Sequence, residues 1–382
     1  MDLRVHRSLD EIPQAAWDAL ADRRASPFTS WAWLEALERA GCVSVDNGWR
    51  AAHLALWRRR ELVAAAPAYL KEDSDGDFSR DWGWAEGAAR AGIPYYPKLC
   101  LTVPFTPVTG PRLLVADGED RAACVAALVD GARRLARDEA NGVHVLFSTD
   151  GEARELAPLG LARRVGLQYH WRNDGYSSPD DFLARFDSKR RNAAKRERAE
   201  PAKQGIAIRT VRGDELAAAP ERFADAAFEL HRSTVEKLMW GRGWLNRDFY
   251  RLVMARMPES IELVEARRDG KLVAGAFNVA TPTHLYGRYW GCFEEHRFLH
   301  FNVCLYHSID ECIRRGVRVF EGGAGGEHKL ARGFEPAETF SAHWLADERL
   351  DRAVRDYAVA EAAERERGIA RWRAVSPILK QR

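Results

Sequence analysis

The sequence predicts an α/β protein made of two similar units with mixed sheets, joined by a basic helical segment. A chain of 382 residues is longer than one ordinary core needs, which favours two or three domains. The expected order of elements is two helices, a hairpin, a strand, a helix and a strand, and this order occurs twice. We therefore expect one domain over residues 1–165 and a second over residues 166–382, which includes the basic segment and a C-terminal helix.

Composition and charge exclude several classes of protein. Hydrophobic residues make up 46% of the chain and charged residues 30%, which is typical of a folded globular protein. No apolar run approaches the roughly 18 to 20 residues that span a bilayer, and the first residues lack the apolar core of a signal peptide. We therefore expect a cytoplasmic protein without a transmembrane segment. The net charge of +2 argues against a protein that coats nucleic acid, so any polyanion site must be local.

The cysteines and histidines predict neither a disulfide framework nor a metal site. The six cysteines are scattered and form no Cys-x-x-Cys pair. His296 and His300 are four residues apart, but the segment lacks the glutamate of the zinc-protease helix and a third ligand. We expect no bound metal.

The first copy of the repeat begins with two amphipathic helices. Ser8 and Glu11 have the spacing of a capping box, and Ser30 is placed to cap a second helix that stops at Gly41. A hairpin is then expected over residues 49–70, a helix over 119–139 and a strand over 143–147. The helix over 119–139 is indicated by four apolar residues at helical spacing: Cys124, Leu128, Ala132 and Leu135.

Residues 73–111 are rich in aspartate, glycine, proline and aromatic residues, which predicts a strand region with long loops. Such a region is either a binding surface or a cover for the edge of a sheet. The side chains that we expect to contact substrate there are Trp82, Tyr95, Tyr96 and Lys98.

The second copy follows the same order. Helices are expected over residues 219–237 and 246–257, a hairpin over 261–279, a strand over 284–291, a helix over 302–315 and a strand over 316–320. The turn Asp269-Gly270 supports the hairpin. Residues 61–69 resemble residues 271–279, and residues 141–145 resemble residues 315–319, which supports a duplication. A last strand over 340–345 and a long charged helix from about residue 347 complete the chain.

A basic segment lies between the copies. It opens with a helix start at Ser178, and residues 185–198 carry a net charge of +5, more than the whole chain. Solvated helices usually alternate charges of both signs, so the segment is either an unusually basic solvated helix or a phosphate-binding one. The side chains that we expect to contact nucleic acid are Lys189, Arg190, Arg191, Lys195 and Arg198.

The glycine-rich stretch over residues 321–334 is the first candidate for a functional site. It holds five glycines, two carboxylates, a histidine, a lysine and an arginine directly after an apolar run. A buried strand that leads into such a loop places polar side chains and bare backbone amides at a sheet edge, where ligands commonly bind. The alternative is a glycine-rich connection with a solvated charged end.

This loop carries the groups that acyl transfer to an amine requires, a base and donors for an oxyanion. Glu321 or Glu327 is the candidate base, although Glu321 could also simply cap the loop. Lys329 and Arg332 are the candidate donors to a phosphate or an oxyanion. Further substrate contacts are expected from the loop and from the strand that faces it: Gly322, Gly323, Gly325, Gly326, His328, Tyr286, Arg288 and Tyr289.

The order of elements is that of the GNAT acyltransferase fold, and two such units joined by a basic helix resemble the Fem peptidoglycan aminoacyl ligases. More closely, the chain resembles the FemAB-like family of peptidoglycan biosynthesis or recognition. The motifs that carry the resemblance are residues 81–84, 95–98, 104–107 with 110–113, 286–290 and 321–334. The resemblance implies tandem GNAT-like units and transfer of an amino acid from aminoacyl-tRNA to an amine on a cell-wall precursor. It also implies that Lys329 holds a phosphate or stabilises the oxyanion.

The glycine-rich cradle that holds the pyrophosphate of acetyl-CoA in ordinary GNAT enzymes is missing from both copies. Residues 293–302 contain no glycine, and residues 106–112 contain one glycine between two prolines, which cannot donate a backbone hydrogen bond. This departure favours aminoacyl-tRNA as the acyl donor, with no cofactor. The alternatives are an N-acyltransferase with an atypical acyl-CoA site, and a binding module without catalysis that recognises a cell-wall precursor or RNA.

Overall fold

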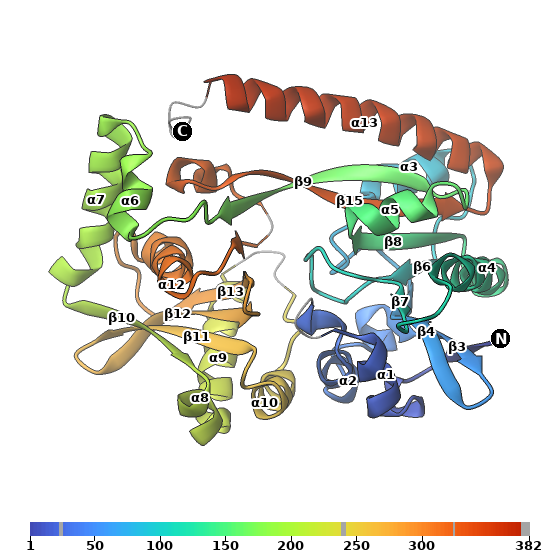
Figure 1. Ribbon diagram of the computed structural model, residues 1–382, viewed down its shortest axis with the longest axis horizontal. Coiled ribbons are helices and arrows are strands. Elements are labelled where there is room, and N and C mark those ends of the chain that lie inside the picture. The colour runs from blue at the N-terminus through green and yellow to red at the C-terminus, as the bar shows by residue number, and fades with distance from the viewer. Residues whose placement is uncertain (23–25, 238–241, 324, 376–382) are drawn as a thin grey trace. The chain divides into compact units, whose positions relative to one another are not determined.

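The computed structural model describes residues 1–22, 26–237, 242–323 and 325–375 (Figure 1). The chain forms two compact units, which we describe separately. The first comprises Met1–Leu167 with Glu338–Gly368, and the second comprises Gln168–Ala337 with the segment from Ile369. The chain enters the second unit within β9 (Ala162–Arg172) and returns to the first within β15 (Glu335–Leu345).

The expected division of the chain was wrong at its C-terminal end. Residues 338–368, which the sequence assigned to the second domain, belong to the first unit. The reason is packing: Leu345, Leu350 and Val354 share a hydrophobic cluster with Trp84 and Tyr95. The last helix, α13 (Glu348–Val375), is thereby attached to the first unit over most of its length.

The first unit contains two sheets. One has the order β1-β3-β4-β7, and the strands of the other that lie in this unit have the order β15-β8-β6-β5-β2. The strands are β1 (Asp2–His6), β2 (Trp49–Ala51), β3 (His53–Arg58), β4 (Glu61–Ala66), β5 (Ala68–Lys71), β6 (Lys98–Leu101), β7 (Leu114–Val115) and β8 (Gly142–Ser148). The helices are α1 (Gln14–Leu20), α2 (Trp31–Arg39), α3 (Trp82–Arg90), α4 (Arg121–Glu139) and α5 (Asp150–Leu156).

The expected hairpin is present as β3 and β4, which pair through the turn at residues 58–61. Pro67 explains why the chain leaves this sheet after β4 and enters the other sheet as β5. It lies between β4 and β5 and has no N–H to give to a strand partner, while its carbonyl accepts a hydrogen bond from Thr102 N. β4 pairs with β3, and β5 pairs with β2 and β6. The expected helix from Ser8 is also corrected, because Ser8 caps a single 3-10 turn and α1 begins only after Pro13.

Helix α4 confirms the periodicity expected for it. Cys124, Leu128, Ala132 and Leu135 are buried against the strands of this unit. Within residues 73–111, where strands and long loops were expected, the chain instead forms helix α3, on which Trp84 is buried and Trp82 is 55% exposed.

The second unit contains the repeat in the expected order. Its sheet has the strand order β10-β11-β12-β13-β14-β9. The strands are β10 (Ile206–Arg212), β11 (Ile261–Arg268), β12 (Lys271–Ala280), β13 (His284–Cys292) and β14 (Val319–Glu321). The helices are α6 (Pro179–Ala184), α7 (Ser188–Lys203), α8 (Asp214–Ala218), α9 (Pro220–Val235), α10 (Arg247–Arg256), α11 (Leu299–Phe301) and α12 (His307–Arg315). A π-helical stretch, Asn302–Tyr306, joins α11 to α12. The predicted fold class, two α/β units with mixed sheets, is confirmed.

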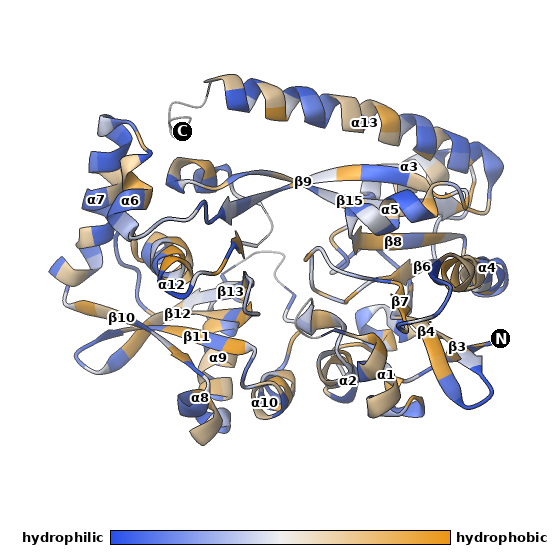
Figure 2. Cartoon of the chain, viewed as in Figure 1, coloured by the Kyte–Doolittle hydropathy of each residue, from blue (hydrophilic) through white to orange (hydrophobic). Residues whose placement is uncertain are grey.

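The basic segment forms two helices rather than one. Ser178 caps α6, and Asp187 caps α7 by accepting a hydrogen bond from Arg190 N. Hydrophilic residues predominate along α7 (Figure 2).

β13 and β14 set the position of the candidate site, because they are parallel neighbours over three residue pairs only. His284, Leu285 and Tyr286 pair with residues 319–321, and β13 then continues without β14 to Cys292. A bulge at Arg288 shifts the register against β12, where Phe277 pairs with Tyr289 and Asn278 with Gly287. The glycine-rich loop leaves the sheet where the two strands end their pairing. No helix among the described residues has the length and apolar character needed to cross a membrane.

Candidate functional site

Three neighbouring strands of the second unit place Tyr286, Glu321 and His170 in one row across the sheet. Tyr286 on β13 pairs with Glu321 on β14, and Glu321 pairs with His170 on β9. Directly paired residues present their side chains on the same face. The next row, Leu285, Phe320 and Trp171, therefore points to the opposite face, where all three side chains belong to one hydrophobic core. The alternation gives this part of the sheet one apolar face and one polar face.

The polar row is largely withdrawn from water. His170 is 7% exposed, Glu321 6% and Tyr286 2%. His170 Nε2 lies 3.8 Å from Glu321 Oε2 and 3.3 Å from Gln168 Oε1. Burial, with smaller contributions from neighbouring Arg172, His284 and Lys329, lowers the pKa of His170 to about 3. The imidazole is therefore neutral near pH 7, while it lies beside a carboxylate.

Lys329 organises the glycine-rich loop next to this row. It lies on a 3-10 helix, Glu327–Arg332, and its Nζ donates hydrogen bonds to the carbonyl oxygens of Gly323 at 2.6 Å and Gly325 at 2.7 Å. Burial lowers the pKa of Lys329 to about 8, and the side chain has no carboxylate partner among the described residues. Ala324, inside the loop, lies outside the described residues.

Two glycines of the loop are required by close approach and by backbone conformation. A Cβ atom at Gly322 would lie 2.9 Å from the ring of Phe334 and 3.3 Å from Lys329 Cε. Gly326 has a φ of +88°, which side-chain-bearing residues rarely adopt. The glycine-rich loop predicted from the sequence is therefore present. Lys329, which was expected to contact a phosphate or an oxyanion, instead donates to the loop's own carbonyl groups in this structure.

Arg332 contacts other groups than Lys329 does. It is 5% exposed, its Nη2 lies 2.9 Å from Glu197 Oε2, and its guanidinium stacks 3.3 Å from the centroid of Phe301. Glu197 also accepts a hydrogen bond from Tyr306 Oη at 2.7 Å and pairs with Arg190 Nη1 at 3.2 Å. Arg332 thus connects the 3-10 helix to α7, which differs from the role as a phosphate or oxyanion donor expected from the sequence.

The remaining candidates of the second unit are dispersed. Glu327 and His328 are exposed, and the His328 ring lies 5.5 Å from that of Phe301. Tyr289 packs on His231, with ring centroids 4.4 Å apart, and Arg288 occupies the bulge of β13. The structure brings together Tyr286, Glu321, Lys329 and the loop glycines. Glu327 is exposed, and Arg332 contacts Glu197 and Phe301.

His170 was missed by the sequence reasoning. It lies on β9, about 150 residues before Glu321 in the chain, and only the strand pairing brings the two together. The available signal was a polar residue at every second position of β9, Gln168, His170 and Arg172, in a strand whose Trp171 is fully buried.

The candidates of the first unit form a buried network. Lys98 is 0% exposed, and its Nζ contacts Asp77 Oδ2 at 2.8 Å and Asp81 Oδ2 at 2.5 Å. Tyr95 Oη donates to Asp81 at 2.6 Å, and Tyr96 Oη lies 2.6 Å from Ser74 Oγ. The two aspartates raise the pKa of Lys98 against the effect of burial. Of the two alternatives for residues 73–111, these contacts favour a structural cover, with exposed Trp82 lying apart from them.

The basic residues of α7 divide into two groups. Arg190 bonds Glu197 and Ala331 O, Arg198 pairs with Asp310, and Arg191 donates to Phe186 O at 3.1 Å. Lys189 and Lys195 are exposed, and Lys195 Nζ lies 3.5 Å from Asp180. Three of the five side chains predicted to contact nucleic acid, Arg190, Arg191 and Arg198, therefore make hydrogen bonds or ion pairs within the protein.

Comparisons with known proteins agree with this architecture. The profile of the FemAB-like family, described as peptidoglycan biosynthesis/recognition, matches residues 8–380. The crystal structure of FemX superposes with a TM-score of 0.53 at 14% sequence identity and covers 93% of this chain and 100% of FemX. That likeness shows a shared fold. No match was found among curated proteins.

Two further solved structures are similar at TM-scores below 0.5. A tandem GNAT protein from the clavulanic acid biosynthesis pathway has a TM-score of 0.45 at 16% identity, with 91% of this chain and 98% of that chain covered. The C-terminal domain of a putative lysylphosphatidylglycerol synthetase from Agrobacterium fabrum has a TM-score of 0.49 at 13% identity, with 90% and 97% covered.

Proposed function

This chain belongs to the FemAB-like family of peptidoglycan biosynthesis and recognition and is an acyltransferase, and on that premise we propose that it transfers an aminoacyl group from aminoacyl-tRNA to an amine of a cell-wall precursor. The reaction takes place at the polar row of the second unit. The observation that carries the proposal is the row Tyr286, Glu321 and His170 at the point where β13 and β14 separate, beside the loop that Lys329 holds.

The groups in the row match the proton transfers of the reaction. The amine nitrogen attacks the ester carbonyl carbon, a C–N bond forms, and the C–O bond to the ribose breaks. Glu321 accepts the proton that the amine loses, and the departing ribose oxygen takes up a proton in its place. Neutral His170, 3.8 Å from Glu321 Oε2, orients that carboxylate without neutralising it.

Lys329 and Arg332 have different parts in this proposal. The Lys329 ammonium turns from the carbonyl groups of Gly323 and Gly325 toward the developing oxyanion or a phosphate of the donor. Arg332 is a positioning residue, because its contacts with Glu197 and Phe301 fix the 3-10 helix that carries Lys329.

Aminoacyl-tRNA is the proposed donor for two reasons. Residues 293–302, which precede the helix at the expected CoA position, contain no glycine, and Phe298 there has a φ of +59°. The exposed lysines of α7, Lys189 and Lys195, supply local positive charge in a chain of nearly balanced charge.

The test offers charged tRNA and acyl-CoA in separate reactions with cell-wall precursors that carry a free amine. Products are identified by mass, and Glu321→Gln serves as the inactive control. We expect the acceptor to gain an aminoacyl residue from charged tRNA alone. A product formed only from acyl-CoA would show that acyl-CoA, and not aminoacyl-tRNA, is the donor. Ligand binding without any product would show that the chain recognises the precursor and does not catalyse transfer.

A further inference from the structure

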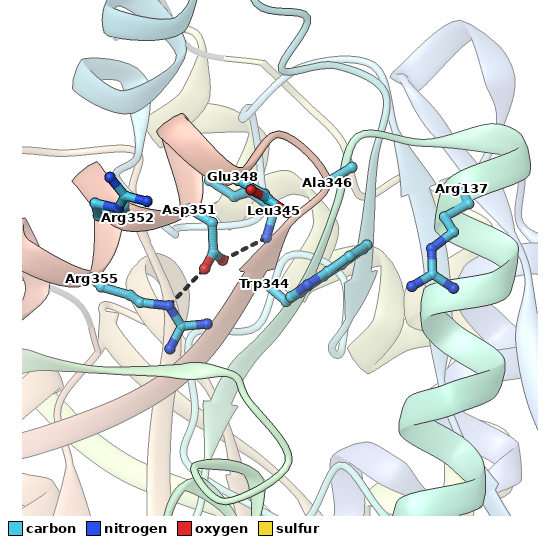
Figure 3. Close-up of a pocket in the computed structure, with 8 residues that line it drawn as sticks. All are labelled: Arg137, Trp344, Leu345, Ala346, Glu348, Asp351, Arg352 and Arg355. Carbon is cyan, nitrogen blue, oxygen red and sulfur yellow. Dashed lines mark hydrogen bonds and ion pairs between the residues drawn. The ribbon is translucent and has the colours of Figure 1, made fainter.

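A cavity in the first unit is lined by residues that take no part in the proposed transfer. It has a volume of about 670 Å³ and is bordered by α4, the end of β15 and the first turns of α13 (Figure 3). Its lining residues are Arg137, Trp344, Leu345, Ala346, Glu348, Asp351, Arg352 and Arg355. This volume is in the range of about 300 to 1,000 Å³ that is usual for small-molecule sites.

Two arginines of the lining have unused donors. In the described part of the chain, neither Arg137 nor Arg352 makes a hydrogen bond or an ion pair, and both side chains are exposed. Arg355 differs, since its Nε donates to Asp351 Oδ2 at 2.6 Å and its Nη2 to Gly160 O at 2.6 Å. Guanidinium groups whose N–H donors have no hydrogen-bond acceptor are suited to bind a phosphate through paired N–H donors.

The acidic residues of the lining do not cancel this charge. Asp351 accepts hydrogen bonds from Leu345 N at 3.0 Å and from Arg355, so its carboxylate is already engaged. Glu348 is exposed at the start of α13. Three arginines therefore face two carboxylates, and one of those carboxylates is held by Arg355.

Trp344 gives the cavity a flat apolar wall. The guanidinium groups of Arg133 and Arg137, four residues apart on α4, lie 5.3 and 5.6 Å from the centroid of its ring. Figure 3 shows the indole between Arg137 on one side and Arg355 with Asp351 on the other. The ring side toward α13 thus borders the cavity, where a planar group can stack on it.

We propose that this cavity binds a mononucleotide, with its phosphate on Arg137 and Arg352 and its base against Trp344. The phosphate is matched by the guanidinium groups with unused donors, and the base is matched by the indole of Trp344. The inference goes beyond the proposed transfer and does not depend on it, because no residue of the cavity belongs to the polar row or to the loop of Lys329.

The test measures binding of ADP and UDP to the full chain by isothermal titration calorimetry, with adenosine and inorganic phosphate as partial ligands. We expect the nucleotides to bind more tightly than either partial ligand. Arg137→Gln and Arg352→Gln should each weaken nucleotide binding about tenfold, because each removes a charge-assisted contact. Trp344→Leu should weaken binding of ADP and leave that of inorganic phosphate unchanged.

Matched controls lie on the same two helices. Arg134→Gln on α4 and Arg349→Gln on α13 remove the same charge outside the cavity lining and should bind nucleotide as the wild type does. Absence of nucleotide binding at millimolar concentration overturns the proposal. Wild-type affinity in Arg137→Gln and Arg352→Gln also overturns it, as does binding confined to RNA oligonucleotides, which would make the cavity part of an RNA interface.

Discussion

His170 and Glu321 are paired residues of neighbouring antiparallel strands, and His170 Nε2 lies 3.8 Å from Glu321 Oε2. Both side chains are buried, and burial lowers the pKa of His170 to about 3, so the histidine stays neutral beside the Glu321 side chain. The pair is the most direct point at which to test the proposed chemistry.

Glu321→Gln should lower the rate of transfer by roughly a hundredfold or more, because the amide cannot accept the proton of the attacking amine. His170→Gln should cause a smaller fall, since it removes only the group that orients Glu321. Single-turnover rates with saturating donor measure both effects. Equal activity of Glu321→Gln and wild type would exclude Glu321 as the base.

Lys329→Met should reduce transfer by roughly a hundredfold or more, the usual effect of losing one oxyanion donor. The pH profile adds a second test. Because the pKa of Lys329 is about 8, activity that needs its ammonium should decline as pH rises through 8. A variant that keeps wild-type turnover, or a wild-type profile that is flat from pH 7 to 9, would contradict the assignment.

The same pKa predicts how stability depends on pH. The pKa of Lys329 in the folded chain is lowered from 10.5 to about 8, so between these values the unfolded chain binds more protons than the folded one. The contribution of Lys329 to stability should therefore rise from pH 8 to pH 10.5. Denaturant midpoints measured over this range should show a smaller rise for Lys329→Met than for the wild type.

The order of elements could be predicted from the sequence because it depends on local signals. Asp269-Gly270 marked a turn, Ser30 marked a helix start, and the spacing of Cys124 and Leu128 marked the buried face of α4. The assignment of α13 failed because Leu350 and Val354 pack with residues far earlier in the chain, which no local signal reveals.

The candidate site was predictable only in part, for the same reason. Lys329 and the glycines are close in the chain, so their association with Glu321 could be expected from sequence. The partner of Arg332 is Glu197, which the sequence presented only as one of two acids in a basic segment. His170 reaches Glu321 through strand pairing, and such non-local contacts are set by the whole fold.

Lys98→Met should destabilise the first unit by about 3 to 5 kcal/mol, because it leaves Asp77 and Asp81 as buried carboxylates without their cation. The free energy of unfolding from denaturant titrations measures the effect. If Lys98 instead contacts substrate, the variant should keep its stability and show a raised KM, which would restore the binding-surface interpretation of residues 73–111.

Replacing both Lys189 and Lys195 of α7 with glutamine should weaken tRNA binding and reduce the slope of log affinity against log salt by about 1.5 to 2. Lys271→Gln, which removes one exposed charge on the hairpin of β11 and β12, is the control and should leave the slope unchanged. An unchanged slope in the double variant would show that Lys189 and Lys195 of α7 do not contact tRNA.

His144 and His343 should make the first unit sensitive to acid. Both side chains are 0% exposed, and their Nδ1 atoms lie 2.9 Å apart. Burial, together with nearby Lys98 and Arg164 and against the opposing effect of Asp81, lowers the pKa of His144 to about 3, and burial lowers that of His343 well below its usual value.

Proton binding determines whether the stability of the first unit rises or falls with pH. Between pH 6.5 and about 3 the unfolded chain binds protons that the folded pair does not, so stability is full above pH 6.5 and declines as pH falls through this window. Denaturant midpoints at pH 7, 6 and 5 should therefore decrease in the wild type. Replacing both histidines with asparagine should flatten the decrease, even if the variant is less stable at pH 7. Equal slopes in the two proteins would show that other groups cause the acid sensitivity.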